Sequence, residues 1–459
     1  MASPGMAPPA EPRAPRATRL LLALAVALPL VLVAAGMAHD GWLSDTHGAF
    51  LHRVRFALER GRLELLGFEY PPLPFLLLIP WASATATWVL GGLAVTALAW
   101  LVLDECTERR SILPLTLLVA ALWTPIGLHL VIGDFNEAIG LLALFIGWRH
   151  YRRWWSTRQT IHGLRTGLWL GLAFYTSPLG LAVAMVAGAI LPLVFPRLQI
   201  PPFASQLVLL VFPGLAAAAT WAYLSWVFVG HVAFPFTPWE PGSPVLGEIL
   251  RWSIPYLAVS ALLWLRPSAT AAGVLLPLGL LWLANRIGWH FSLAFAVVLL
   301  TLVAIVSLPR QLDRAVRTLL AAVAVTQAVI AWVTWPLPVR TEADRAAEAV
   351  AQALATAPAR SILIDDRHAE ALLKWAPSLE PYLTTRDTGF EIAMSEPLTT
   401  VRYVLTMASD SAVTLDARRF PPRGFVRAWH WRGYTLWRHP EAPTPTLRFD
   451  AVLDRGRLE

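Results

Sequence analysis

Long apolar runs are the feature that most constrains this sequence. Runs of roughly 18 or more apolar residues recur between Leu20 and Trp335, and a helix of that length spans the hydrocarbon core of a bilayer. The chain is 56% hydrophobic and 15% charged, whereas soluble domains carry about 25% charged residues. We therefore predict an all-α polytopic membrane domain with about eleven transmembrane helices.

The predicted spans follow the apolar runs closely. They cover residues 19–38, 85–103, 112–132, 135–148, 164–176, 179–195, 206–229, 253–265, 269–285, 291–308 and 317–335. Three of them (135–148, 164–176 and 253–265) are short for a full crossing, so either they extend into their flanks or one pair is re-entrant, and the count is open by two. A further apolar piece at 71–83 begins with two prolines and is too short to span.

The arginines predict the orientation. They cluster in the tail 1–18, in the loop 149–165 and around Arg310, which all fall on one side of the predicted topology. Arginine-rich short loops stay in the cytoplasm, so the N-terminus is predicted to be cytoplasmic. The alanine- and arginine-rich composition, with Lys374 as the one lysine, is typical of a GC-rich bacterium, which indicates the bacterial cytoplasmic (inner) membrane. The arginines form no basic patch with interleaved aromatics, which argues against nucleic-acid binding.

The predicted domains follow from these patterns. Residues 1–18 are expected to be a disordered cytoplasmic tail, residues 19–336 a transmembrane domain with outer loops 39–83 and 230–252, and residues 337–459 an extracytoplasmic domain. In that last segment the spacing predicts a helix over 342–356, strands at 361–364 and 401–407, and a hairpin over 425–437 that turns near Arg432-Gly433. The C-terminal segment is therefore predicted to be a small α/β domain.

The first outer loop contains an amphipathic segment at 45–60. Phe50, Val54 and Leu58 fall on one stripe, which is typical of a helix lying in the membrane interface with its apolar face in the headgroup boundary. Asp45 stands at its start, where a carboxylate caps free backbone N–H groups. The spacing alone leaves open whether Asp45 is a helix cap or a functional acid.

The second outer turn, Gly133 to Glu137, holds two more acids. Asp134 is placed to cap the following helix, and Glu137 stands three residues later in a capping-box position. Yet Asp45, Glu69 and Asp134 all fall on the predicted outer face at membrane depth, where ionisable groups are costly unless they are paired or functional. This shared location favours a functional interpretation.

The first outer loop resembles a known family. Its pattern is an acid that opens an interfacial helix, then a glycine, then an acid before Pro-Pro-Leu, and it is carried by Asp45, Gly61, Glu69, Pro71, Pro72 and Leu73. This pattern is similar to that of the GT-C superfamily of integral-membrane glycosyltransferases, in particular the protein O-mannosyltransferase and aminoarabinose transferase type. Further similar segments are 133–136, 167–173 and 226–239. The chain departs from the family pattern at Thr46, where the family has glutamate, and at Ser177-Pro178, where it often has lysine.

The resemblance implies an inverting transferase that moves a sugar from a polyprenyl-phosphate-linked donor to a glycan, lipid or protein acceptor at the outer face. Asp45 would be the general base. Glu69, Asp134 and Glu137 would hold a divalent metal (Mg or Mn) or order the donor-phosphate region. Arg286 and His290 would bind the donor phosphate, although interfacial anchoring is the alternative for both. The residues implied to shape the groove or contact the sugar are Tyr70, Pro71, Pro72, Trp42 and Trp239.

Two other interpretations stay open. A transporter or flippase of a lipid-linked substrate would show inverted repeats or paired broken helices at the membrane midplane, and the sequence shows no internal symmetry. A non-catalytic GT-C-like scaffold protein would keep the fold and lose catalytic groups, and the absence of the family's lysine at Ser177-Pro178 fits it. The charged residues crowd the outer boundary rather than the helix centres, which favours the enzyme.

Overall fold

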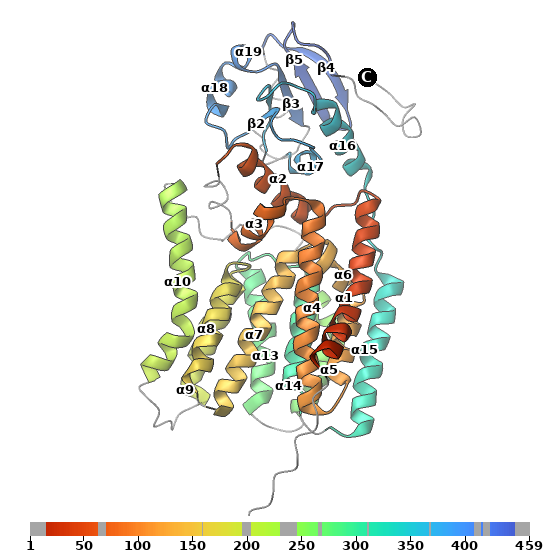
Figure 1. Ribbon diagram of the computed structural model, residues 1–459, viewed down its shortest axis with the longest axis vertical. Coiled ribbons are helices and arrows are strands. Elements are labelled where there is room, and N and C mark those ends of the chain that lie inside the picture. Colours follow the sequence, from red (N-terminus) through yellow and green to blue (C-terminus); the bar gives the residue numbers. More distant parts are fainter. Residues whose placement is uncertain are drawn as a thin grey trace, which may run out of the picture.

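A helical bundle carries a small mixed-sheet domain at one end (Figure 1). The computed structural model describes residues 15–62, 70–157, 159–194, 203–229, 246–264, 269–309, 312–366, 369–407, 415 and 423–445. Two short helices, α2 (Asp45–Glu59) and α3 (Pro72–Leu78), lie between the bundle and the sheet domain. A short 3₁₀ turn, η2 (Ile79–Trp81), follows α3.

The bundle helices occupy the predicted ranges, with the exception of α11 (Leu246–Arg251), which lies in the predicted outer loop 230–252. They are α1 (Arg16–His39), α4 (Ala84–Arg109), α5 (Leu113–Leu122), α6 (Pro125–Ile132), α7 (Phe135–Thr157), α8 (Thr160–Phe174), α9 (Leu179–Val194), α10 (Phe203–Val229), α11 (Leu246–Arg251), α12 (Ile254–Trp264), α13 (Ala269–Arg286), α14 (Leu293–Ser307) and α15 (Arg314–Thr334). Among the described residues, α1, α4, α10 and α15 are each long and apolar enough to cross a membrane. The bent pair α5–α6 would make a fifth span. The protein is therefore a mostly helical chain with the helices of a membrane protein.

The predicted span 112–132 is broken into two helices that meet at 77°. Thr124 caps α6 by accepting the Gly127 N–H at 2.9 Å, and Pro125 occupies the first turn, where its missing N–H costs nothing. A Cβ at Gly127 would lie 2.2 Å from the Ala121 carbonyl oxygen. The single straight helix predicted here was wrong, because a cap, a proline and a glycine permit a sharp bend.

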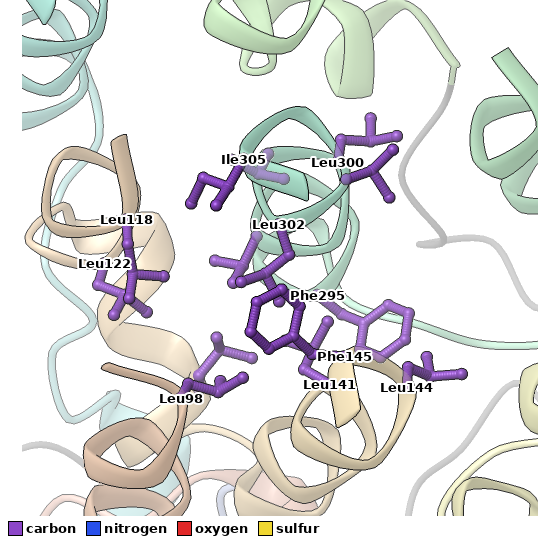
Figure 2. Packing of buried hydrophobic residues seen from close by; sticks show 14 of the residues in the cluster. Leu98, Leu118, Leu122, Leu141, Leu144, Phe145, Phe295, Leu300, Leu302 and Ile305 are labelled. Atoms are coloured by element: carbon purple, nitrogen blue, oxygen red, sulfur yellow. The ribbon is translucent and has the colours of Figure 1, made fainter. Parts of the chain in front are cut away.

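Helix α14 is the centre of the bundle. It is apolar around its circumference, and most of its side chains are buried, as expected for a helix enclosed by others. Figure 2 shows its side chains packed against those of three neighbouring helices. The labelled residues are Leu98 of α4, Leu118 and Leu122 of α5, Leu141, Leu144 and Phe145 of α7, and Phe295, Leu300, Leu302 and Ile305 of α14.

The C-terminal domain is built on a five-stranded sheet in the order β2-β1-β3-β5-β4. Its strands are β1 (Ile362–Leu363), β2 (Tyr382–Leu383), β3 (Tyr403–Met407), β4 (Val426–Trp431) and β5 (Tyr434–Arg438). The first three are parallel, and β5 pairs antiparallel with both β3 and β4. The predicted hairpin turns at Arg432 and Gly433, whose φ values of 49° and 86° fit a primed two-residue turn.

Four helices accompany the sheet. They are α16 (Glu342–Leu354), α17 (Glu370–Leu373), α18 (Phe390–Ser395) and α19 (Pro397–Thr400). Thr341 and Asp344 form a reciprocal capping box at the start of α16. Helices, parallel strands and a hairpin in this segment agree with the predicted α/β character.

The sheet domain shares its core with α2 and α3. Phe50 and Val54 of α2 and Phe75 of α3 belong to one buried cluster with Ile362 and Tyr382 of the sheet. The apolar face of α2 therefore packs against protein. We expected that face to lie in the lipid headgroup region, and this expectation was wrong because the C-terminal domain covers it. Leu58, on the same predicted stripe, is exposed.

Candidate functional site

The start of α2 is bonded to the acidic turn between α6 and α7. The Ser44 hydroxyl accepts the His47 N–H at 3.1 Å, which caps α2, and donates to the Gly133 carbonyl at 2.7 Å. The Phe135 N–H donates to His47 Nε2 at 3.0 Å. The first and second predicted outer loops therefore meet, although they are about 90 residues apart in the chain.

Burial fixes the state of His47. Desolvation lowers the pKa of this imidazole to about 3, with a smaller contribution from the nearby His129. The ring is therefore neutral, and because Nε2 accepts a hydrogen bond, the proton sits on Nδ1. Position 133 requires glycine because its backbone lies against the His129 ring, and a Cβ there would be 2.1 Å from that ring.

Asp134 caps α7. Its Oδ1 accepts the N–H groups of Asn136 at 2.9 Å and Glu137 at 3.3 Å. Burial raises the pKa of Asp134 from 3.8 to about 7, although these two hydrogen bonds act in the opposite direction. Among the described residues no cation forms an ion pair with Asp134. A carboxyl group with a pKa near neutrality is suited to proton transfer.

Glu137 does not complete the predicted capping box. Its carboxylate accepts the Ser292 N–H at 2.5 Å and the Ser292 hydroxyl, at the start of α14. The Asp134 N–H instead donates to the His129 carbonyl. Because a carboxylate stabilises the positive end of a helix, Glu137 ties the α13–α14 turn to the acidic turn.

The α13–α14 turn holds the predicted phosphate-binding residues. Arg286 and His290 are both exposed, and the Arg286 guanidinium lies 5.7 Å from the centroid of the Trp282 ring. This cation–π contact fits the anchoring alternative. The bond from Ser292 to Glu137 nevertheless brings the turn to the same end of the bundle as Asp134.

Tyr70 and the prolines lie beside the α8–α9 junction. The Tyr70 hydroxyl donates to the Phe174 carbonyl, and its ring packs against the rings of Phe174 and Trp221. Pro71 and Pro72 begin α3, and the next residue is bonded through its N–H to the Tyr175 carbonyl at 3.1 Å. The segment Ser177-Pro178, where the resembled family often has lysine, follows directly.

Asp45 is turned toward the C-terminal domain. Its side chain is 94% exposed, and its Oδ1 lies 2.8 Å from Lys374 Nζ. Lys374 is itself buried and also pairs with Asp344 at 2.6 Å. A Cβ at Gly48 would lie 2.5 Å from the Lys374 Cβ, so the glycine permits this contact. The N-cap of α2 is Ser44 rather than Asp45, because a residue inside the first turn does not have the extended backbone of a cap.

Sequence reasoning missed Lys374 as a site residue. It is the one lysine of the chain, which was a usable signal, but its partner Asp45 lies 329 positions away. Trp42 is half-buried and packs against the bundle core. Glu69 and Trp239 lie outside the described residues.

Glu69, one of the three acids expected to hold a Mg or Mn ion, lies outside the described residues. No group of three or more His, Cys, Asp or Glu side chains gathers among the described residues, and Oδ1 of Asp134 is engaged by two backbone N–H groups. A Mg²⁺ site draws one or two of its six oxygen ligands from carboxylates and the rest from waters and phosphates. We therefore assign no step to a metal.

The arrangement gives three acids two different environments. Asp45 has a lysine partner from another domain, whereas Asp134 and Glu137 have no ion-pair partner among the described residues. Asp45 is therefore suited to holding two parts of the protein together. Asp134 and Glu137 are suited to exchanging protons or to binding a positively charged group. Comparison with protein-family models, curated proteins and solved structures finds no significant match to this chain.

Proposed function

We propose that this chain is a membrane glycosyltransferase of the GT-C type, which moves a sugar from a polyprenyl-phosphate-linked donor to an acceptor at the outer face of a bacterial cytoplasmic membrane. In this proposal all eleven predicted ranges span the bilayer, the N-terminus is cytoplasmic and the sheet domain is extracytoplasmic. A helix lies in each of those ranges, with the range 112–132 divided between α5 and α6.

One observation carries the proposal. Three segments far apart in sequence, the start of α2, the acidic turn before α7 and the turn before α14, are joined by hydrogen bonds from Ser44 to Gly133 and from Ser292 to Glu137. They gather Asp45, Asp134 and Glu137 at one end of the bundle, below a sheet domain. This agrees with the resemblance of the first outer loop to GT-C enzymes, in which such acids serve catalysis.

The chemistry proposed is a single displacement at the anomeric carbon. A carboxylate takes the proton of the acceptor hydroxyl, the acceptor oxygen bonds to the anomeric carbon, and the bond to the phosphate oxygen breaks, with the electron pair leaving on the polyprenyl phosphate. The resemblance assigns the base to Asp45. Asp134 is a second candidate, because its raised pKa of about 7 suits proton transfer near neutral pH.

Asp45 must part from Lys374 to act as a base. A carboxylate held by an ammonium group at 2.8 Å is stabilised in its charged form and is a weaker base. The contact therefore also fits the scaffold alternative, in which Asp45 only holds the sheet domain. The two interpretations differ in what the loss of the carboxylate does to sugar transfer.

The test is sugar transfer in membranes containing the chain, with radiolabelled sugars on polyprenyl phosphate as donors. Asp45→Asn is expected to reduce transfer by about 10²–10⁴-fold, while Asp40→Asn, which changes an exposed acid just before α2, leaves it unchanged. Transfer at the unaltered rate by Asp45→Asn, with loss in Asp134→Asn, moves the base to Asp134. If neither variant alters a measurable transfer, both assignments of the base fail. If no donor supports transfer by the unaltered protein, the enzyme proposal fails.

A further inference from the structure

At the end of the bundle opposite the sheet domain, a basic cavity opens between the α4–α5 turn and the start of α15. Its volume is about 260 Å³, many times the roughly 10–15 Å³ that one water requires. Three arginines and one serine supply its polar lining, and no carboxylate of the described residues lines it. The lining residues are Arg109, Arg110, Ser111, Leu113, Pro114, Leu308, Pro309, Leu312 and Arg317.

Arg109 forms the buried wall of this cavity. It is 9% exposed, and its terminal N–H groups donate to the carbonyls of Val306 at 2.8 Å and of Leu308. These are carbonyls of the last turn of α14, so the guanidinium covers the negative end of that helix. Its Nε is buried and has no hydrogen-bond partner among the described residues. The Nε of Arg317, on the far side of the cavity, is in the same state.

Three acids of α4 pair with arginines at this end. Asp104 pairs with Arg19 and with Arg149 at 3.3 Å, and Glu105 pairs with Arg149 at 3.1 Å and with Arg109 of the cavity wall at 3.5 Å. Glu108 pairs with Arg152 at 3.0 Å and with Arg153 at 3.8 Å. Among the described residues no carboxylate lines the cavity, which keeps the positive charge of Arg317.

Two helices begin at the cavity. α5 starts at Leu113, whose N–H donates to the Ser111 hydroxyl at 3.3 Å, and α15 starts at Arg314, where the N-cap residue Asp313 makes no side-chain capping bond. Free N–H groups at a helix start attract anions. Together with the buried, unpartnered Nε atoms of Arg109 and Arg317, they give a site with donors and positive charge on several sides.

From these observations we propose that the cavity binds a phosphate group. Arg317 supplies charge and N–H donors, and the Ser111 hydroxyl, whose oxygen accepts the Leu113 N–H, supplies a further donor. The phosphate belongs to an anionic lipid headgroup or to a free phosphate ion. The apolar wall of Leu113, Leu308 and Leu312 would contact the glycerol and upper acyl chain of a lipid, as in basic pockets that hold lipid headgroups between transmembrane helices. This inference does not depend on the proposed transferase activity.

The test uses the full chain in a neutral detergent, with native mass spectrometry to count retained phosphatidylglycerol or phosphatidylcholine. We expect Arg317→Gln to weaken phosphatidylglycerol binding about tenfold, the effect of losing one charge-assisted hydrogen bond. Arg153→Gln is the matched control, because it removes an exposed arginine of the same end that does not line the cavity. Each variant must keep the unfolding midpoint of the unaltered protein without lipid.

A second arm separates the two sources of phosphate. The unfolding midpoint is followed by tryptophan fluorescence while inorganic phosphate is added, with chloride at the same ionic strength as reference. A shift with phosphatidylglycerol alone identifies a lipid headgroup site, and a shift with phosphate that Arg317→Gln abolishes identifies a free-anion site. Equal losses in Arg153→Gln and Arg317→Gln, or no preference for the anionic ligands, would overturn the proposal.

Discussion

The acidic residues at the two ends of the helical bundle differ in whether they form ion pairs. At the end away from the sheet domain, Glu105 of α4 is fully buried and lies within 3.5 Å of nitrogen atoms of Arg109, Arg149 and Arg152. At the other end, Asp134 and Glu137 of the α6–α7 turn accept hydrogen bonds only from neutral groups and have no ion-pair partner among the described residues. A buried charge is tolerated when it is paired, so the first end is organised for stability.

The acids without ion-pair partners, Asp134 and Glu137, indicate a functional rather than a stabilising role. An uncompensated carboxyl group near a membrane is costly, and such groups mark functional sites in membrane proteins. The raised pKa of Asp134 reflects this cost, because burial disfavours its charged form. The contrast therefore separates two roles for similar residues, and the predictions below test it by removing one acid at a time.

The largest expected effect is on sugar transfer by Asp134→Asn. Asparagine keeps the side-chain oxygen that caps α7 but does not exchange a proton, so transfer should fall by about 10²–10⁴-fold if Asp134 is the base. The amount of folded protein should be unchanged or higher. The measurement is transfer per folded molecule in membranes. A variant that loses activity only in proportion to its loss of folded protein would make Asp134 a structural residue like Glu105.

The second largest effect is the loss of stability in Glu105→Ala. Removing the central carboxylate leaves three arginines without their shared partner, which should cost about 3–5 kcal/mol of unfolding free energy. The matched control is Glu108→Ala, since Glu108 is 39% exposed in the same network and should cost about 1 kcal/mol or less. Reversible unfolding in mixed micelles measures both. Equal costs would mean that burial does not distinguish the two acids.

The third effect is a pH dependence of stability that belongs to Asp134. Its pKa is raised from 3.8 to about 7 on folding, so between these values the folded state holds a proton that the unfolded state has released. Stability should therefore fall as the pH rises from about 4 to about 7, by up to about 4 kcal/mol at 1.36 kcal/mol per pH unit. Asp134→Asn should reduce this slope, and the remainder belongs to Glu137, which is buried in the same turn. An unchanged slope in the variant would show that another group carries the titration.

The sequence predicted local structure well because local signals encode it. The amphipathic stripe at 45–60 gave α2 to within one residue, and the pair Arg432-Gly433 gave the hairpin turn. The two-residue strand β2 carries too little pattern to be recognised. The segment 112–132 contains Pro125 and Gly127, which favour a break in the helix. Its continuous hydrophobicity led us to predict one helix instead.

The site was predicted less completely because its contacts are distant in sequence. Asp45, Glu69 and Asp134 were named from their shared outer location. The segments of Asp45 and Asp134 are joined by the hydrogen bond from Ser44 to Gly133, and Glu69 lies outside the described residues. Nothing near Asp45 indicated that its partner would be Lys374, or that Glu137 would bind Ser292, 155 positions later. Periodicity reports which face of a helix is buried, but it does not report what covers that face.

The smallest expected effect concerns the contact between the two domains. Lys374→Met removes the cation that joins Asp45 of α2 to Asp344 of α16, and it should cost about 1–2 kcal/mol, because Asp45 is exposed and Asp344 is only partly buried. Arg345→Met, an exposed change on α16, is the control. Lys374 also carries the one side-chain amine of the chain, so it should resist amine-reactive labels in the folded protein and react after unfolding.

Combining Lys374→Met with Asp45→Asn distinguishes an anchor from a base. If Asp45 only holds the sheet domain, the two changes remove the same contact, and their stability costs should be less than additive while transfer stays intact. If Asp45 is the base, Asp45→Asn abolishes transfer, whereas Lys374→Met leaves a carboxylate that no longer has to part from an ammonium group. Lys374→Met should then transfer sugar as fast as the unaltered protein or faster, and the loss of transfer in Asp45→Asn is the result that a purely structural contact does not produce.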